Sequence, residues 1–245
     1  MPTIQEYNRW GEEMARLLRL STSPIAVKML KSEAGIPKGA LRPKRDQNRH
    51  YAQCQVFGLA RRNRLTVAML REDNWCLGPP MAYGLVDAGD VPSGVGPEYK
   101  RFEVGRYIGI LTGPLESAAF KPDLVLVYAD THQLRSMLLS LREEDKPKVR
   151  SNFFPISCAF AVTHPILENA YWINLPDPGE YVRALAQPGE LIFSIPARKM
   201  PGFIRGLRKF YRESMFADEQ MLMQSDFSQP EIYRKLFGRW GMEHS

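Results

Sequence analysis

Three cysteines, Cys54, Cys76 and Cys158, are the residues of this sequence with the most distinctive chemistry. Cys54 begins a helix-like segment (AQCQVFGLARR), Cys76 precedes Gly78 and two prolines, and Cys158 follows Pro155 in FPISCAFAV. Helix N-termini and glycine turns present free backbone N–H groups, which stabilise thiolates and hydrogen-bond the sulfurs of iron–sulfur clusters. Three thiolates can hold three irons of a 4Fe-4S cluster and leave the fourth iron open as a Lewis acid.

The spacing of these cysteines leaves other interpretations open. Separations of 22 and 82 residues are unlike a compact ferredoxin run, so only the fold would assemble the site. Free cysteines are also common core residues. A Cys3His zinc site would need His50, His132 or His164, and His50 lies one helical turn before Cys54. A cysteine nucleophile would need a base, and His164 follows Cys158 by six residues.

Hydrophobic spacing predicts the elements that must position these residues. Apolar residues recur every three or four positions from Ile4 to Leu18, and Thr3 with Glu6 forms a capping box, so an amphipathic helix is expected within 1–22. Further helices are expected at 51–62, 131–141 (capped by Asp130 or Thr131), 201–215 and 230–237. Strands are expected at 25–30, 65–70, 107–111, 124–128, 171–175 and 191–195. This alternation predicts an α/β fold, or an α+β arrangement, with a mixed sheet flanked by helices.

The length of 245 residues and the 44% hydrophobic content predict one domain spanning 1–245. The segment 215–245 is rich in Met, Phe and charge and is expected to be a C-terminal helical extension that docks on the same chain or on a partner. The sequence does not fix the oligomeric state. No internal repeat or linker interrupts the chain.

Composition narrows the class of protein. No run reaches the roughly 18 apolar residues of a membrane span, and the N-terminus lacks a signal-peptide core, so a cytoplasmic protein with no membrane partner is expected. An odd number of scattered cysteines favours reduced thiols. The loops GPPMAYG and PSGVG match neither a P-loop nor a GxGxxG fingerprint, and no nucleotide cofactor is expected.

The net charge of +6 and the pI near 9.2 allow an anionic partner. Part of this charge is local, in the basic segment from Lys38 to His50. Such a segment attracts nucleic acid or a phosphorylated small molecule, or is a solvated loop. Neither a zinc-finger spacing nor an RNP-type aromatic signature accompanies it, which makes nucleic acid the weaker interpretation.

Six segments in order resemble the DUF169 family: PIAVK, CQVFGLAR, CLGPPMAYGL, KPDLVLVYADTHQLRSML, SCAFAV and YWINLPDPG. The resemblance runs from about Ser23 to about Leu207. It implies that Cys54, Cys76 and Cys158 occupy recurrent cysteine positions of the family, which favours ligands over incidental core residues.

The resemblance also singles out Gln133 and Asp177. Gln133 falls on a family motif position after the strand 124–128, at a sheet edge where ligands gather, and binds a substrate, caps a helix or simply packs in the first turn of one. Family members often carry Pro-Cys-x-Gly where this chain has Pro176-Asp177-Pro178-Gly179. Asp177 is then a hard oxygen ligand, a sign of an open iron site, or a loop residue without a role.

These observations lead to a hypothesis of an iron–sulfur protein. Cys54, Cys76 and Cys158 bind a 4Fe-4S cluster with one open iron, which performs redox or Lewis-acid chemistry of an oxidoreductase or lyase on a small, anionic molecule. Lys28 and Gln133 are the candidate catalytic residues. The Arg61/Arg62 pair is expected beside the pocket or at a solvated helix end. The alternatives are a non-catalytic small-molecule-binding or accessory protein with structural cysteines, and a cysteine- or zinc-dependent hydrolase or transferase.

Overall fold

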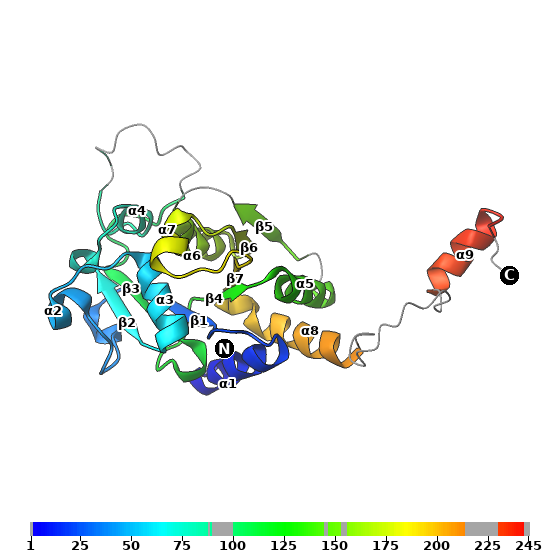
Figure 1. The fold of residues 1–245 in the computed structure, drawn as a ribbon, viewed down its shortest axis with the longest axis horizontal. Helices are drawn as coiled ribbons and strands as arrows, with labels where there is room; N and C mark the ends of the chain where they lie inside the picture. Colours follow the sequence, from blue (N-terminus) through cyan, green and yellow to red (C-terminus); the bar gives the residue numbers. More distant parts are fainter. Residues whose placement is uncertain are drawn as a thin grey trace. The chain divides into compact units, whose positions relative to one another are not determined.

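The centre of the fold is a single sheet. The computed structural model describes residues 2–87, 89, 100–144, 147–152, 156–213 and 230–242. Its described strands form a seven-stranded sheet in the order β2-β3-β1-β4-β7-β6-β5 (Figure 1). Neighbouring strands are antiparallel, except β5 and β6, which are parallel. The sheet is therefore mixed, and the expected α/β class is confirmed.

The strands lie close to the predicted positions, with one addition. Their bounds are β1 Ile25–Leu30, β2 Val67–Leu70, β3 Gly109–Pro114, β4 Leu124–Ala129, β5 Val149–Asn152, β6 Tyr171–Asn174 and β7 Leu191–Pro196. β4 was predicted from its continuous apolar run, and every one of its residues is buried, as a strand covered on both faces requires. β3 begins two residues after the start of the predicted strand 107–111, and β5 was not predicted.

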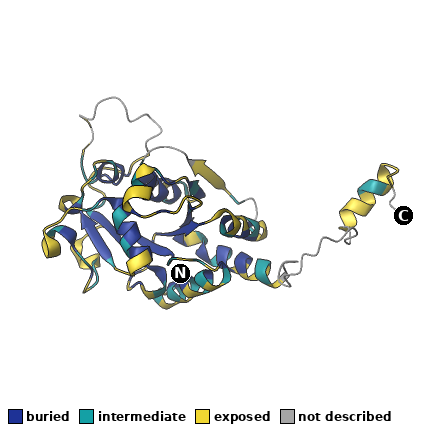
Figure 2. Cartoon of the chain, in the orientation of Figure 1, coloured by how far each residue is buried: buried dark blue, intermediate teal, exposed yellow. Residues whose placement is uncertain are grey.

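Helices cover both faces of the sheet. On one face lie α3 (Gln53–Asn63), α4 (Gly78–Ala82) and α6 (Ser157–Glu168), whose buried residues share a core with β1, β2 and β4, and α7 (Pro178–Arg183), which contacts α3. On the other face lie α1 (Ile4–Leu17), α5 (Thr131–Ser140) and α8 (Met200–Glu213) (Figure 1). Figure 2 shows most of the sheet buried between these layers, with the edge strand β5 exposed and exposed residues on the outer sides of the helices.

The capping residues that the sequence identified begin two of these helices. The Thr3 hydroxyl accepts from the Glu6 backbone N–H, and the Glu6 carboxylate accepts from the Thr3 N–H at 2.7 Å, which is a complete capping box. Asp130, the first of the two residues proposed, caps α5 by accepting from the Gln133 N–H at 2.7 Å. α1 is shorter than the predicted segment 1–22 and ends at Leu17.

Several helices were not expected. The predicted loop between residues 31 and 48 contains α2 (Pro43–Gln47) and a 3-10 turn at Glu33–Gly35. α4, α6 and α7 are also additions to the predicted set. They matter most for function, because they carry or adjoin Cys76, Cys158 and Asp177. The second glycine loop, at 91–99, lies outside the described residues.

By its contacts the chain divides into two compact units, Met1–Phe210 and Tyr211–Ser245. The sheet belongs to the first unit. In the second, the described residues 230–242 contain α9 (Glu231–Arg239), where the predicted helix was 230–237. On this helix the ring of Phe237 contacts the rings of Tyr233 and Trp240. Among the described residues, no helix combines the length and hydropathy that a membrane crossing needs.

Candidate functional site

The three cysteines of the candidate site lie close enough in the fold to influence the pKa values of Cys54 and Cys158. Cys54 is the second residue of α3, Cys158 is the second residue of α6, and Cys76 lies two residues before α4. Burial raises the pKa of Cys54 to about 12, and Glu180, Cys76 and Asp177 raise it further in that order of importance. Burial also raises the pKa of Cys158 well above its usual value, with contributions from Glu180 and from both other cysteines. Cys76 thus influences the pKa of Cys54, and both Cys54 and Cys76 influence the pKa of Cys158.

Two glycines allow the helices that carry these cysteines to approach. A Cβ atom on Gly78 would lie 2.6 Å from Cγ2 of Ile156, two residues before Cys158, so Gly78 lets the Cys76 segment pack against the start of α6. A Cβ atom on Gly58 would lie 3.3 Å from the backbone of Ala184, at the end of α7. Both contacts are closer than ordinary side-chain packing, which explains why glycine stands at these two motif positions.

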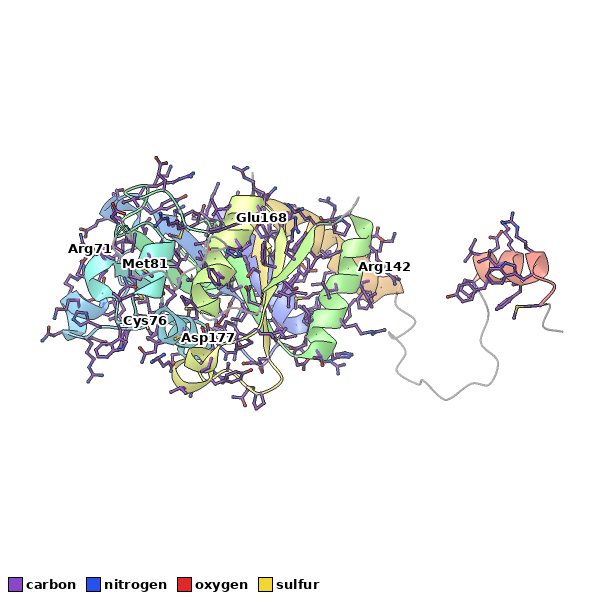
Figure 3. All side chains as sticks on the ribbon, turned by 90° about the horizontal axis from the view of Figure 1, so that it is seen from above. Arg71, Cys76, Met81, Arg142, Glu168 and Asp177 are labelled. Carbon is purple, nitrogen blue, oxygen red and sulfur yellow. The ribbon has the colours of Figure 1, made fainter. Side chains whose placement is uncertain are left out.

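Asp177 joins the start of α6 to the start of α7. Its Oδ2 accepts from the Ser157 backbone N–H at 2.8 Å, and its Oδ1 accepts from the Glu180 N–H at 3.1 Å. The Ser157 hydroxyl in return accepts from the Asp177 N–H at 3.1 Å. Asp177 is thus the N-cap of α7, and it fixes the turn that precedes Cys158. In Figure 3, Cys76 and Asp177 lie on the same side of the molecule.

A buried acid lies beside the cysteines. Glu180 of α7 is fully buried, and burial raises its pKa to about 8, although the hydrogen bond from Tyr128 opposes the rise. The Tyr128 hydroxyl donates to Glu180 Oε2 at 2.8 Å, while Oε1 has no hydrogen-bond partner among the described residues. Burial therefore favours the protonated form of Glu180.

Arg61 closes this network from α3. Its guanidinium donates to both carboxylate oxygens of Glu190, at 2.8 and 2.9 Å, and lies 4.0 Å from the centre of the Tyr128 ring. The side chain is fully buried, so the charge is neutralised by a bidentate ion pair within the protein. Of the expected pair, Arg61 lies next to the site, whereas the Arg62 guanidinium donates to the Leu185 carbonyl at 2.6 Å in an exposed contact.

Two buried amides near the cysteines lack partners. Both polar atoms of the Gln53 side chain, directly before Cys54, and both of the Asn174 side chain have no hydrogen-bond partner within the described part of the chain. Asn174 and Tyr128 both pair with Ile192 across the sheet, so their side chains lie on the same face. An unpartnered buried polar group costs about 1–3 kcal/mol, and such groups are typical of binding sites.

Sequence reasoning missed Gln53, Asn174 and Glu180. Gln53 directly precedes the motif CQVFGLAR, and Asn174 and Glu180 lie within or beside YWINLPDPG, so position in the motifs was the one available signal. Whether a polar side chain points into the core depends on the face of its element, and the sequence shows no clear period in these short segments.

The two candidate catalytic residues lie elsewhere. Gln133 caps α5: its Oε1 accepts from the Asp130 N–H at 2.9 Å, and its Nε2 donates to the Arg19 carbonyl at 3.0 Å. This is the capping alternative of the three that the sequence left open. Lys28 lies on β1 and lines a separate pocket, where its Nζ donates to the Lys121 carbonyl at 3.3 Å. Neither residue is among the groups that shift the pKa of Cys54 or Cys158.

The histidines do not adjoin the cysteines as the spacing suggested. His50 precedes α3, which begins at Gln53, and it is exposed; it is a surface histidine and does not share a helical face with Cys54. His164 is buried in α6 between the rings of Phe160 and Trp172. Burial lowers the pKa of His164 to about 4, with smaller effects of charged groups that do not include a cysteine.

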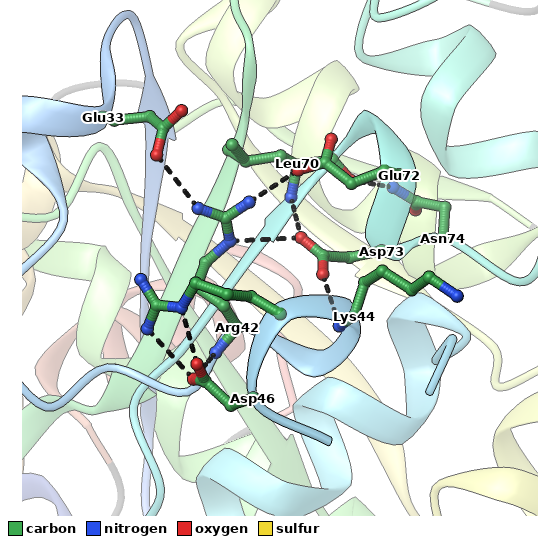
Figure 4. A network of polar contacts seen from close by, with 9 residues as sticks. Glu33, Arg42, Lys44, Asp46, Leu70, Glu72, Asp73 and Asn74 are labelled. Atoms are coloured by element: carbon green, nitrogen blue, oxygen red, sulfur yellow. Dashed lines mark hydrogen bonds and ion pairs between the residues drawn. The ribbon is translucent and has the colours of Figure 1, made fainter. Parts of the chain in front are cut away.

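The basic segment from Lys38 to His50 is partly neutralised within the protein (Figure 4). Arg42 is almost fully buried and binds three carboxylates: Glu72 at 2.6 Å, Glu33 at 3.2 Å and Asp73 at 3.3 Å. Asp46 binds the Arg45 side chain at 2.5 Å. Acidic side chains of the same fold therefore compensate part of the charge that suggested an anionic partner.

The sequence suggested a zinc or iron–sulfur centre, which needs several His, Cys, Asp or Glu side chains around one metal site. Among the residues that the structure describes, no group of three or more His, Cys, Asp or Glu side chains is arranged to hold a metal ion. A tetrahedral zinc site with Zn–S distances near 2.3 Å needs sulfurs about 4 Å apart.

The chain is thus an α/β protein with two buried thiols, Cys54 and Cys158, at the N-termini of α3 and α6, and a buried carboxyl, Glu180, on α7. The family model of DUF169, described as Uncharacterised ArCR, matches residues 13–206. The chain belongs to this family, as the order of its motifs predicted. Comparison with curated proteins and with solved structures gives no match.

Proposed function

We propose that Cys54, Cys76 and Cys158 bind a 4Fe-4S cluster that has one iron without a protein ligand. The observation that supports this proposal is that Cys54 and Cys158 are the second residues of α3 and α6, and that Cys76, which precedes α4, contributes to the raised pKa of both. Soft thiolates are the usual ligands of such clusters. When bound, the cluster would supply electron transfer or Lewis-acid activation of a small molecule.

The residues around the thiols support this assignment. Gln53 and Asn174 each bring an amide N–H group that has no acceptor among the described residues, and cluster sulfurs are acceptors for such groups. Burial raises the pKa of Glu180 to about 8, and Glu180 is the largest charged contributor to the raised pKa of both Cys54 and Cys158.

The raised pKa values of Cys54 and Cys158 make a prediction about loading. In the metal-free protein both residues are thiols at neutral pH, and a metal ligand must be a thiolate. Binding therefore releases protons, and loading is more favourable at higher pH. The cluster's own positive iron ions supply the driving force for deprotonation.

A non-catalytic accessory protein with structural cysteines is the second candidate. The observation that favours it is the burial of Cys54 and Cys158 within the main core. It accounts less well for the amides of Gln53 and Asn174, because buried amides without hydrogen bonds destabilise a core that binds nothing.

Anaerobic reconstitution with iron and sulfide separates these candidates. The proposal predicts a brown protein that absorbs near ~400 nm, and loss of iron and sulfide in each of Cys54→Ser, Cys76→Ser and Cys158→Ser. Ala159→Ser is the matched control, because it also introduces a buried hydroxyl at the start of α6 and should load normally. A colourless wild-type protein would refute the proposal, and zinc without sulfide would favour the hydrolase or transferase alternative.

A further inference from the structure

A second site lies at the opposite end of α6 from the cysteines. A pocket of about 750 Å³ is bounded by the end of β1, the start of β4, the end of β7 and the C-terminal end of α6. This volume is within the range of small-molecule sites. The 12 residues of α6 span about 18 Å, so the pocket and the thiols are separate sites.

Positive charge dominates the lining of this pocket. The five cationic residues of the lining are Lys28, Lys31, Arg106, Lys121 and Arg198. One carboxylate accompanies them, which gives the lining a net charge of +4, compared with +6 for the whole chain. Most of the excess charge of the protein is therefore concentrated around one cavity, where it attracts anions.

The carboxylates nearby do not neutralise these cations. In the described part of the chain none of the five forms an ion pair. Asp123, the one carboxylate of the lining, accepts a hydrogen bond from the Met29 backbone N–H at 2.9 Å and so joins β1 to the segment before β4. Glu168, at the end of α6 (Figure 3), binds Lys100, Lys148 and Arg150 instead.

The C-terminus of α6 opposes anion binding, but weakly. Its carbonyl groups carry a partial charge of about −0.5, which is small beside the net +4 of the lining. Apolar surface is also present, from Tyr107 and Ile166. The pocket thus combines several cations with room and apolar contact for an organic group.

We infer that this pocket binds a small molecule with at least two negative charges, of the phosphate-ester or pyrophosphate type. Ammonium and guanidinium groups from four separate segments suit phosphate oxygens that point in different directions. The inference goes beyond the iron–sulfur proposal, because it uses none of the residues of the thiol cluster.

Calorimetric titration of the full chain with inorganic pyrophosphate at low ionic strength tests this site. The wild-type protein should bind, and Lys28→Gln/Arg198→Gln should weaken binding about tenfold or more. Lys38→Gln/Arg49→Gln is the matched control: it removes two positive charges from the exposed basic segment and should change affinity less than about twofold.

Two results of this titration would show that the pocket does not bind such an anion. Absence of pyrophosphate binding to the wild-type protein, or an equal loss of affinity in both double variants, would overturn it. Cys158→Ser should bind pyrophosphate like the wild type whether or not it loads iron, since Cys158 lies at the other end of α6. Failure of the iron–sulfur proposal and failure of this inference are therefore distinguishable.

Discussion

Replacing Glu180 by glutamine tests whether the buried carboxyl of α7 is protonated in the folded protein. Its pKa rises from 4.5 to about 8 because the group is buried. Between these values the unfolded chain loses a proton that the folded chain keeps. The stability that the neutral carboxyl contributes is therefore complete below pH 4.5 and is lost as the pH rises through 8. From these two values the loss between pH 5 and pH 9 is about 4 kcal/mol.

Glutamine removes this loss and keeps an oxygen that accepts from the Tyr128 hydroxyl. The free energy of unfolding can be measured with urea on the metal-free protein, followed by tryptophan fluorescence. The difference in this free energy between Glu180→Gln and wild type should shift by about 4 kcal/mol in favour of the variant as the pH rises from 5 to 9. Glu12→Gln, on the exposed side of α1, is the control and should gain almost nothing. A relative gain below about 1 kcal/mol for Glu180→Gln would mean that Glu180 is ionised in the fold.

Three further changes test the packing and charges around the site. Burial lowers the pKa of His164 to about 4, so this side chain stays neutral in the folded protein, whereas in the unfolded chain it takes up a proton below pH 6.5. The free energy of unfolding should therefore fall by about 3 kcal/mol as the pH drops from 6.5 to 4. His164→Phe should flatten that part of the pH–stability curve, and an unchanged slope would contradict the assignment. Asp177→Asn keeps only one acceptor oxygen, whereas the backbone N–H groups of Ser157 and Glu180 both need an acceptor. The free energy of unfolding in urea should therefore fall by about 1–2 kcal/mol. Gly58→Val should lower stability by about 1–3 kcal/mol in the same assay, since its side chain meets the backbone at the end of α7; wild-type stability would show that the helices are not in close contact.

The elements that sequence predicted well are those with a clear hydrophobic pattern. α1 shows the three- and four-residue spacing of an amphipathic helix together with a capping box, and β4 is an uninterrupted apolar run. α6 was missed because SCAFAVTHPIL is apolar on all sides and contains Pro165. A helix buried on most of its surface has no polar face to mark its period. β5 was missed because it is a four-residue edge strand with a polar sequence.

The candidate site was predictable in its cysteines and not in its surroundings. The positions of Cys54, Cys76 and Cys158 within motifs singled them out, although their separation in sequence contains no information on distance in space. Glu180 and Asn174 belong to the site because of the face of the element on which each lies, which depends on packing. Lys28 was expected beside the cysteines, but its strand carries it to the separate pocket.

Mössbauer spectroscopy of protein reconstituted anaerobically with iron-57 and sulfide tests the central claim most directly. A cluster held by three cysteines has one iron in a different ligand environment from the other three. The account predicts about four irons and four sulfides per chain, with iron signals in a ratio of about 3:1. Absence of bound iron and sulfide, or a cluster whose irons are all equivalent, would contradict the claim that Cys54, Cys76 and Cys158 hold a 4Fe-4S cluster with an open iron.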